Sequence, residues 1–301
     1  MPQSESTTRS HHPGGPIQTH RRGRVPWIVV GVVWIGINAA LLLFFREPSD
    51  AQPGYDPPSH LLGTLDEVSL PLQWQGSGSA LQDVRLRLMS PDRSEEQTQY
   101  PLVLFLHGAG PRGDDNRSHL IEVPARLASR QWRTRYPCFL AAPQCPPGSY
   151  WTSQIDVLVS LIEALCERYP IDRRRIYLTG LSMGGFGSWH LAAHRPDLFA
   201  AVVPICGGGD PTQAERLADV PLWAVHGAAD QVVPVASTRQ MIDAIRQAGG
   251  DPKYTELPGV GHNCWTETYQ DENGPIPWMF RQKRTLAAES LGSRMNQPGS
   301  P

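Results

Sequence analysis

The chain has 301 residues and a net charge of −2 at neutral pH, which gives no reason to expect a nucleic-acid partner. This length can form one large domain with a sizeable core, and the 28 glycines and 29 prolines favour a loop-rich protein over a helical bundle. The five cysteines lack the short paired spacing of a zinc site. We therefore expect no structural metal.

The N-terminal part of the chain predicts a membrane anchor. Residues 1–24 are polar, contain four arginines and are predicted to be a disordered cytoplasmic tail. Residues 25–45 contain no charge and would span about 30 Å as a helix, the thickness of a bilayer's hydrocarbon core. We predict a transmembrane signal anchor that contacts the lipid bilayer there. Because the arginines precede it, the rest of the chain is expected in the periplasm or outside the cell.

A cleaved signal peptide is the alternative for this segment, since a basic start followed by an apolar stretch serves both purposes. In that case the protein would be secreted. Residues 46–60 are rich in proline and are predicted to be an extended linker. The folded domain is expected over 61–285, and the polar residues 286–301 are predicted to be a disordered tail.

Within the folded domain, strand and helix patterns alternate. The segment 61–89 has the short alternating pattern of antiparallel strands. Further strands are predicted at 101–106, 138–142, 176–179, 200–205, 222–225 and 254–257, with helical patterns at 153–169, 186–194 and 236–248. This alternation predicts an α/β fold with a mostly parallel central sheet and helices on both faces.

The segment Gly180-Leu181-Ser182-Met183-Gly184 lies between a predicted strand and a predicted helix. A Gly-x-Ser-x-Gly turn in that context is a nucleophile elbow, in which the flanking glycines fit where side chains would not. Ser182 is therefore the predicted nucleophile. The free N–H groups at the start of the following helix suit an oxyanion, and we assign the Met183 N–H as one donor.

A serine hydroxyl needs a base and a group that orients the base. Asp230 follows the predicted strand 222–225, and His262 lies in a glycine-flanked loop after the strand 254–257. Because the carboxyl ends of parallel strands meet at one edge of a sheet, we expect Ser182, Asp230 and His262 to form a catalytic triad.

Other residues were weighed for the same roles. Asp210 follows a strand too early to be the acid, and Asp251 precedes a strand. His226 comes before the acid and is interpreted as shaping the turn.

The second oxyanion donor is expected from the loop after the strand 101–106. Ala109 is the preferred backbone donor, and Gly110 is the second choice and a predicted substrate contact. His107 is interpreted as a structural brace of this loop.

Two further residues near the predicted site were assigned to binding or packing. Trp151 is predicted to line the acyl or alcohol pocket, with surface packing as the alternative. Arg112 would suit an acidic substrate, but pairing with the neighbouring Asp114 or Asp115 is the interpretation we favour.

Two cysteines are predicted to lie near the same edge of the sheet. Cys206 directly follows the strand 200–205, and Cys264 lies two residues after His262. In an exported domain they would be able to form a disulfide that fixes the histidine loop. We keep this as a hypothesis.

These motifs together resemble a known enzyme group. The segments 107–110 and 112–116, the elbow 180–185, the glycine-rich strand end 204–210 and Gly261-His262-Asn263 resemble the small α/β-hydrolase serine esterases. The closest likeness is to the carboxylesterase and dienelactone-hydrolase-like group, which includes predicted secreted peptidases. The resemblance covers about residues 80 to 285.

The resemblance implies an α/β-hydrolase fold and hydrolysis of carboxylic esters of small molecules or polymers, with no cofactor. Dienelactone hydrolases usually carry a cysteine nucleophile, whereas this chain has Ser182. Two other functions remain open at this point, namely a serine peptidase on the same fold and a non-catalytic binding scaffold.

Overall fold

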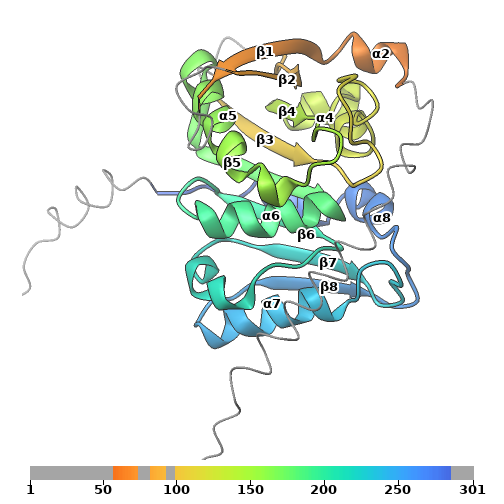
Figure 1. Cartoon of the computed structure of the whole chain (residues 1–301), viewed down its shortest axis with the longest axis vertical. Helices are drawn as coiled ribbons and strands as arrows, with labels where there is room; N and C mark the ends of the chain where they lie inside the picture. The colour runs from red at the N-terminus through yellow and green to blue at the C-terminus, as the bar shows by residue number, and fades with distance from the viewer. Residues whose placement is uncertain (1–56, 74–81, 93–98, 286–301) are drawn as a thin grey trace, which may run out of the picture. The chain divides into compact units, whose positions relative to one another are not determined.

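The computed structural model describes residues 57–73, 82–92 and 99–285 (Figure 1). All of them belong to the compact unit Pro48–Pro301. Among these residues, no helix combines the length and the apolar character needed to cross a bilayer. The predicted anchor at 25–45 and the predicted tails at 1–24 and 286–301 lie outside the described residues.

The described residues form an eight-stranded sheet with the order β1-β2-β4-β3-β5-β6-β7-β8. β1 pairs antiparallel with β2, and β2 pairs antiparallel with β4, whereas the remaining neighbours are parallel. The prediction of a mostly parallel sheet is therefore confirmed. The strands are β1 (Asp66–Leu72), β2 (Gln82–Met89), β3 (Tyr100–Leu106), β4 (Phe139–Pro143), β5 (Ile171–Leu181), β6 (Ala201–Ile205), β7 (Trp223–Gly227) and β8 (Lys253–Leu257).

Every residue of β3, β4 and β6 is buried, as expected for strands covered on both faces. Successive residues of a strand point to opposite faces, so β3 contributes to two apolar cores. Leu102 and Leu104 belong to one core, and Val103 and Phe105 belong to the other.

The helices are divided between these two cores. The first core contains apolar residues of α5 (Ile155–Arg168), α6 (Met183–His194) and α7 (Ala236–Gln247), which cross in front of the sheet in Figure 1. The second core contains residues of α2 (Ser59–Leu62), α3 (Val123–Leu127), α4 (Arg130–Arg135), α8 (Trp265–Gln270) and α9 (Pro275–Met279). Two 3₁₀ helices complete the fold, η1 (Trp151–Ser153) and η2 (Pro211–Leu217). The prediction that helices cover both faces of the sheet is therefore confirmed.

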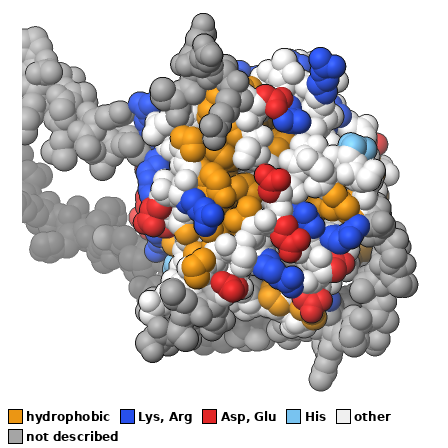
Figure 2. Space-filling model, turned by 90° about the horizontal axis from the view of Figure 1, so that it is seen from above, with side chains coloured by type: hydrophobic (Ala, Val, Ile, Leu, Met, Phe, Trp, Pro, Cys, Tyr) orange, Lys and Arg blue, Asp and Glu red, His pale blue; other side chains and the backbone are white. Residues whose placement is uncertain are grey.

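Charges of both signs are interspersed on the face drawn in Figure 2. Near the antiparallel edge, Glu67 of β1 forms ion pairs with Arg85 and Arg87 of β2. The pair with Arg85 is exposed on both sides and contributes little to stability, about 0–1 kcal/mol, whereas the Arg87 side chain is mostly buried.

Asp172, at the start of β5, is the more strongly bound carboxylate. It accepts hydrogen bonds from the backbone N–H of Arg174 and from the Arg174 and Arg175 side chains, and its own side chain is only 6% exposed. Burial raises the pKa of Asp172, but the hydrogen bonds outweigh burial and hold that pKa below its usual value of 3.8.

Replacing Asp172 with asparagine is therefore expected to lower the free energy of unfolding at neutral pH by about 1–3 kcal/mol. Because the pKa of Asp172 is lower in the folded than in the unfolded chain, this contribution is present above about pH 4 and disappears as the pH falls through the folded pKa. Urea denaturation at neutral and acidic pH measures both effects. The exposed Asp251→Asn variant is the control, and equal stability losses in the two variants would contradict the prediction.

Candidate active site

Ser182 occupies the single position between β5 and α6. Its backbone has φ 53° and ψ −116°, a conformation that costs a non-glycine residue about 1–3 kcal/mol. The turn is held in place on both sides. The Ser182 N–H donates to the Ile205 carbonyl at the end of β6, and the Phe186 N–H donates to the Ser182 carbonyl in the first turn of α6.

The glycines of the elbow permit a very close approach of backbone segments. A Cβ atom added to Gly184 would lie 1.9 Å from the Leu106 carbonyl oxygen, and one added to Gly180 would lie 2.4 Å from the Gly184 carbonyl oxygen. Both contacts are impossible for a real side chain. The start of α6 is thus packed directly against the end of β3.

We predict that Gly184→Ala lowers the free energy of unfolding by at least about 3 kcal/mol, because the Leu106 carbonyl is backbone and cannot move aside cheaply. Gly261→Ala is the matched control, since a Cβ atom there meets no atom within 4 Å. Its expected effect is within about 0.5 kcal/mol. Thermal denaturation of both purified variants tests this, and a Gly184→Ala protein as stable as Gly261→Ala would contradict the elbow geometry.

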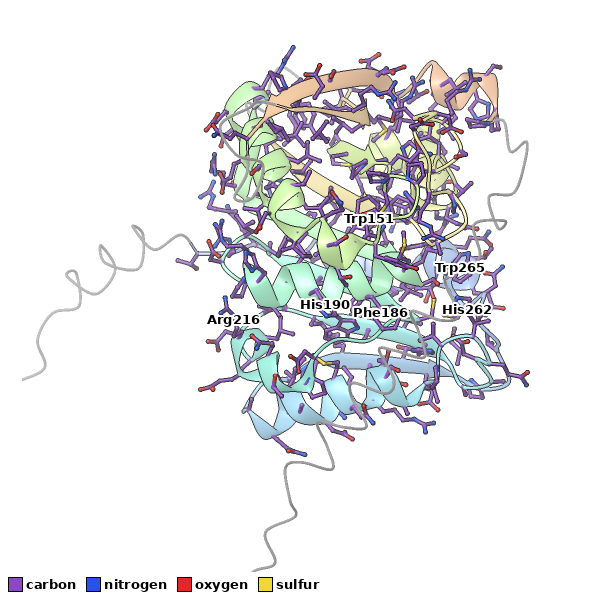
Figure 3. All side chains as sticks on the ribbon, viewed as in Figure 1. Trp151, Phe186, His190, Arg216, His262 and Trp265 are labelled. Carbon is purple, nitrogen blue, oxygen red and sulfur yellow. The ribbon has the colours of Figure 1, made fainter. Side chains whose placement is uncertain are left out.

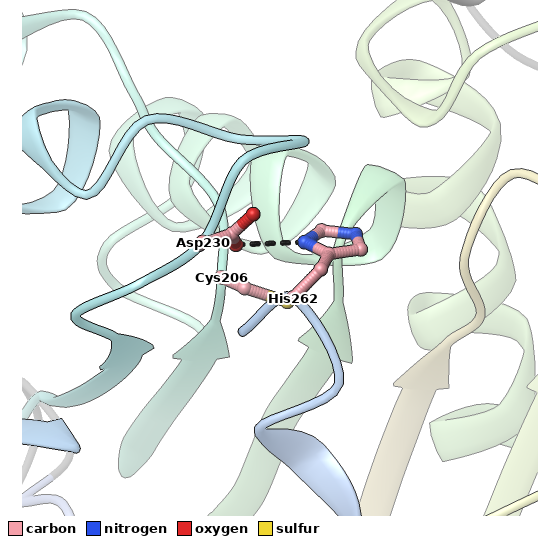
Figure 4. Close-up of side chains that lie close together, drawn as sticks. All are labelled: Cys206, Asp230 and His262. Carbon is pink, nitrogen blue, oxygen red and sulfur yellow. Dashed lines mark hydrogen bonds and ion pairs between the residues drawn. The ribbon is translucent and has the colours of Figure 1, made fainter. Parts of the chain in front are cut away.

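The three residues predicted to form the triad lie in one hydrogen-bonded chain. His262 Nε2 is 2.9 Å from Ser182 Oγ, and His262 Nδ1 is 2.7 Å from Asp230 Oδ2. Figure 4 shows the second contact, with the neighbouring strands pointing toward it. An ionised carboxylate only accepts hydrogen bonds, so Nδ1 carries the ring proton and donates a hydrogen bond to Asp230. Nε2 is then unprotonated and accepts a hydrogen bond from the serine hydroxyl.

Trp265, the first residue of α8, packs against His262. Its ring lies edge-on to the His262 ring with 5.2 Å between centroids, and the two side chains lie next to each other in Figure 3.

The Ser182 residue is 6% exposed and the His262 side chain 18% exposed, whereas the Asp230 carboxylate is fully buried. Of the three hydrogen-bonded side chains, Ser182 and His262 are therefore the ones that solvent reaches.

Asp230 is held by more than the histidine. Its Oδ1 accepts hydrogen bonds from the backbone N–H groups of Val232 and Val233, at 2.8 and 2.9 Å. Burial raises the pKa of this carboxyl, but the hydrogen bond from His262 and the two backbone bonds outweigh burial and lower the pKa below 3.8. Asp230 is therefore ionised at neutral pH.

His226 also contacts Asp230, which the sequence did not predict. Its Nε2 lies 3.1 Å from Asp230 Oδ2 and 3.0 Å from the Val233 carbonyl, and its Nδ1 lies 2.7 Å from Thr238 Oγ1. The ring is fully buried, and burial lowers its pKa. His226 thus shapes the turn, as interpreted, and in addition binds the carboxylate. The contact depends on the turn that follows β7 and not on a helical period, so no pattern in the sequence indicated it.

The two predicted oxyanion donors belong to backbone segments that meet beside the serine. Within the described residues, neither the Ala109 N–H nor the Met183 N–H has a hydrogen-bond acceptor. A Cβ atom on Gly108 would lie 3.7 Å from Ser182 Cβ, which brings the loop after β3 next to the elbow. Gly110 lies in the same loop and is partly exposed.

Arg112 does not pair with Asp114 or Asp115, contrary to the interpretation favoured from the sequence. Its Nε donates to the Ala109 carbonyl at 3.0 Å, and its guanidinium lies 5.2 Å from the centre of the Tyr150 ring. Asp115 instead accepts bonds from its own loop and from Gln144. The pairing fails because the loop turns the arginine back onto its own backbone.

Trp151 is 2% exposed, and its indole N–H donates to the His107 carbonyl at 2.9 Å. The side chain lines a cavity of about 360 Å³ whose other lining residues include Arg85, Gly113 and Gln144. None of the three residues of the hydrogen-bonded chain lines this cavity.

Cys206 lies close to the same chain. Among the described residues, its Sγ, a carboxylate oxygen of Asp230 and a ring nitrogen of His262 form a group whose atoms lie within 4.8 Å of one another. This group does not fit a metal ion. Two ligand atoms bound to one ion at about 2.0–2.3 Å would lie farther apart than the 2.7 Å that separates His262 Nδ1 from Asp230 Oδ2. Cys206 and Cys264 are both buried free thiols, so the hypothesised disulfide is not formed in this structure.

Comparisons with known proteins agree with this architecture. A model of the Dienelactone hydrolase family matches residues 152–276. Feruloyl esterase D of Neurospora crassa is 33% identical over 207 residues, which cover 62% of this chain and 67% of that protein. A bifunctional acetylxylan esterase/xylanase of Neocallimastix patriciarum is 34% identical over 83 residues, 28% of this chain and 12% of that protein.

Among solved structures, a thermostable esterase is 34% identical with a TM-score of 0.67, covering 74% of this chain and 64% of that one. The chain spans less than half the length of several other curated relatives that it matches. The resemblance identified from the sequence motifs is confirmed by these matches. The chain belongs to the small α/β-hydrolase serine esterases of the dienelactone-hydrolase-like group.

Proposed function

We propose that the protein hydrolyses carboxylic esters through a covalent acyl-enzyme on Ser182. The observation that carries this proposal is the continuous hydrogen-bonded chain from the serine hydroxyl through His262 to the buried Asp230 carboxylate. This is the geometry that a serine nucleophile requires, with a base within reach and a carboxylate that orients the base.

In the first half of the reaction, Ser182 Oγ attacks the acyl carbon while His262 Nε2 takes the hydroxyl proton. The negative charge on the acyl oxygen is stabilised by the Ala109 and Met183 N–H groups. His262 then gives its proton to the leaving alcohol, and the C–O bond of the ester breaks. Asp230 stabilises the imidazolium that forms between the two transfers.

In the second half, a water molecule attacks the acyl-enzyme and His262 takes its proton. The proton returns to Ser182 Oγ as the acid product leaves. Nucleophile, base and oxyanion donors are all supplied by the chain, so the proposed reaction uses no metal or cofactor. The names of the esterase relatives support an ester substrate, of a small molecule or a polymer.

Steady-state kinetics test this proposal. The purified wild type is expected to have a higher kcat/KM for p-nitrophenyl acetate and butyrate than for the matched p-nitroanilides, and Ser182→Ala is expected to lose the ester activity. Equal or greater activity on the anilides would favour a peptidase. Ester hydrolysis that persists in Ser182→Ala would contradict the assignment of the nucleophile. Feruloyl esters and acetylated sugars extend the panel to the esters that the relatives' names indicate.

We also propose that residues 25–45 anchor the enzyme in a membrane with the catalytic domain exported. The support is the uncharged length of this segment and the four arginines before it. Protease added to spheroplasts expressing the full chain is expected to degrade the catalytic domain while the membrane fraction retains the N-terminal segment. Full protection of the domain would contradict the orientation, and release of the domain into the medium would indicate a cleaved signal peptide.

A further inference from the structure

The loop after β3 begins with His107, a buried residue that the proposed mechanism does not use. Both of its ring nitrogens are hydrogen bonded. Nε2 lies 2.9 Å from the backbone nitrogen of Cys145, and Nδ1 lies 2.6 Å from the carbonyl oxygen of Gly108. The residue itself is fully shielded from solvent.

These two partners determine which nitrogen carries the proton. The Cys145 N–H only donates, so Nε2 accepts and is unprotonated. The Gly108 carbonyl only accepts, so Nδ1 carries the proton and donates it. Burial lowers the pKa of His107 to about 3, with a smaller contribution from His119, and the ring is neutral throughout the pH range in which esterases work. The donor on Nδ1 is therefore always present.

The carbonyl that His107 holds belongs to the same peptide unit as the Ala109 N–H. A peptide unit is planar and trans, so its N–H points opposite to its C=O. Fixing the direction of the Gly108 carbonyl therefore fixes the direction of the Ala109 N–H. The backbone of a glycine rotates more freely than that of any other residue, so the peptide unit between Gly108 and Ala109 needs an external restraint.

The restrained peptide lies beside the nucleophile and is fixed from a second side. A Cβ atom on Gly108 would lie 3.7 Å from Ser182 Cβ. The Trp151 indole N–H donates to the His107 carbonyl, and the Trp151 and His107 rings pack edge-on with centroids 5.1 Å apart. Trp151 thereby holds the backbone on which the His107 ring is mounted.

We propose that His107 is a positioning residue of the oxyanion hole: by binding the Gly108 carbonyl, its Nδ1–H aims the Ala109 N–H at the acyl oxygen of an ester attacked by Ser182. The proposal rests on the proposed function and adds to it a residue that never touches the substrate. A simple brace, by contrast, would use both ring nitrogens only to stabilise the loop.

Two amide variants separate these roles because they replace different halves of the imidazole. The amide nitrogen of His107→Asn reaches the position of Nδ1 and retains the donor to Gly108. The amide oxygen of His107→Gln reaches the position of Nε2 and retains the acceptor for Cys145. Each variant loses one of the two hydrogen bonds, so the two are matched in what they remove from the loop.

The proposal predicts that His107→Gln lowers kcat on p-nitrophenyl butyrate by about 10- to 100-fold, with KM changed by less than about threefold. The reason is that an oxyanion donor acts in the transition state, so misaligning it affects kcat and leaves substrate binding nearly unchanged. His107→Asn is expected to retain kcat within about fivefold of the wild type, although its melting temperature falls about as much as that of His107→Gln. Equal losses of kcat, or a larger loss in His107→Asn, would overturn the proposal.

Two structural measurements test the role of His107 without relying on enzyme activity. Nitrogen-15 NMR of histidine-labelled wild-type protein is expected to show the Nδ1-protonated neutral tautomer for His107, and an Nε2-protonated ring would overturn the proposal even if a variant does not fold. Crystal structures of the two variants are expected to show the Gly108 carbonyl unmoved with asparagine and rotated with glutamine. A wild type with no Ser182-dependent ester hydrolysis would refute the proposed function, whereas these structural outcomes judge only the role of His107.

Discussion

Replacing Ser182 with alanine should lower kcat for ester hydrolysis by about 10⁵- to 10⁶-fold, the largest effect expected of any single substitution in this chain. The hydroxyl is placed to attack because its oxygen lies 2.9 Å from the base His262. The fold should be unaffected. Alanine retains the Cβ atom, so the backbone strain at φ 53° is unchanged, and the serine side chain makes no capping bond to α6.

Ser188→Ala is the matched control for this experiment. Ser188 is likewise a buried serine and lies within α6, but its hydroxyl donates to the Gly184 carbonyl and makes no contact with His262 or Asp230. We expect its kcat to stay within about twofold of the wild type, as for substitutions that leave the transition-state contacts in place. A comparable loss in both variants would mean that disturbance of α6, and not loss of the nucleophile, causes the effect.

Replacing Asp230 with asparagine should lower kcat by about 10³- to 10⁴-fold. Asparagine has nearly the same shape, and its carbonyl oxygen can still accept from the Val232 and Val233 N–H groups. Its NH₂ group would then face His262 Nδ1, which can no longer donate to it. His262 would shift its proton to Nε2, where it blocks removal of the serine proton.

Asp210→Asn separates the role of Asp230 from a general effect of removing a carboxylate. Asp210, the other acid weighed from the sequence, accepts bonds from the Thr212 N–H and hydroxyl at the start of η2. We expect unchanged kcat and a change in the free energy of unfolding within about 0.5 kcal/mol, because the asparagine oxygen caps a helix about as well as the aspartate oxygen does. Loss of activity in Asp210→Asn with retention in Asp230→Asn would show that the acid was wrongly assigned.

The main strands and helices were predictable because their patterns are strong. The apolar run 101–106 and the amphipathic segment 236–248 match β3 and α7 closely. Strand order was not predictable in the same way. Nothing in the local pattern of 138–142 indicates that β4 lies between β2 and β3, because order depends on how the connections cross the sheet.

The short helices between β3 and β4, and those after β8, were also missed. α3, α4, α8 and α9 have five or six residues each, too few for a helical period to stand out from the surrounding loops. Tertiary packing stabilises such segments more than their own propensity does. Trp132 of α4 and Met279 of α9, for example, are buried in the core on that face.

Some features of the site could be predicted from the sequence and others could not. Ser182, Asp230 and His262 could be selected because each follows a strand and carries a side chain with a distinct chemical role. The contacts of His226 and Arg112 could not, because they depend on the path of a loop. His226 turns toward Asp230, and Arg112 turns toward the Ala109 carbonyl and away from the adjacent aspartates.

The most direct test of the account is mass spectrometry of the intact protein after treatment with a fluorophosphonate, followed by peptide mapping. A serine activated by His262 should gain one phosphonyl group on Ser182, and the His262→Ala variant should label far more slowly. Absence of labelling in the folded wild type, or labelling at another residue, would contradict the claim that these side chains activate Ser182.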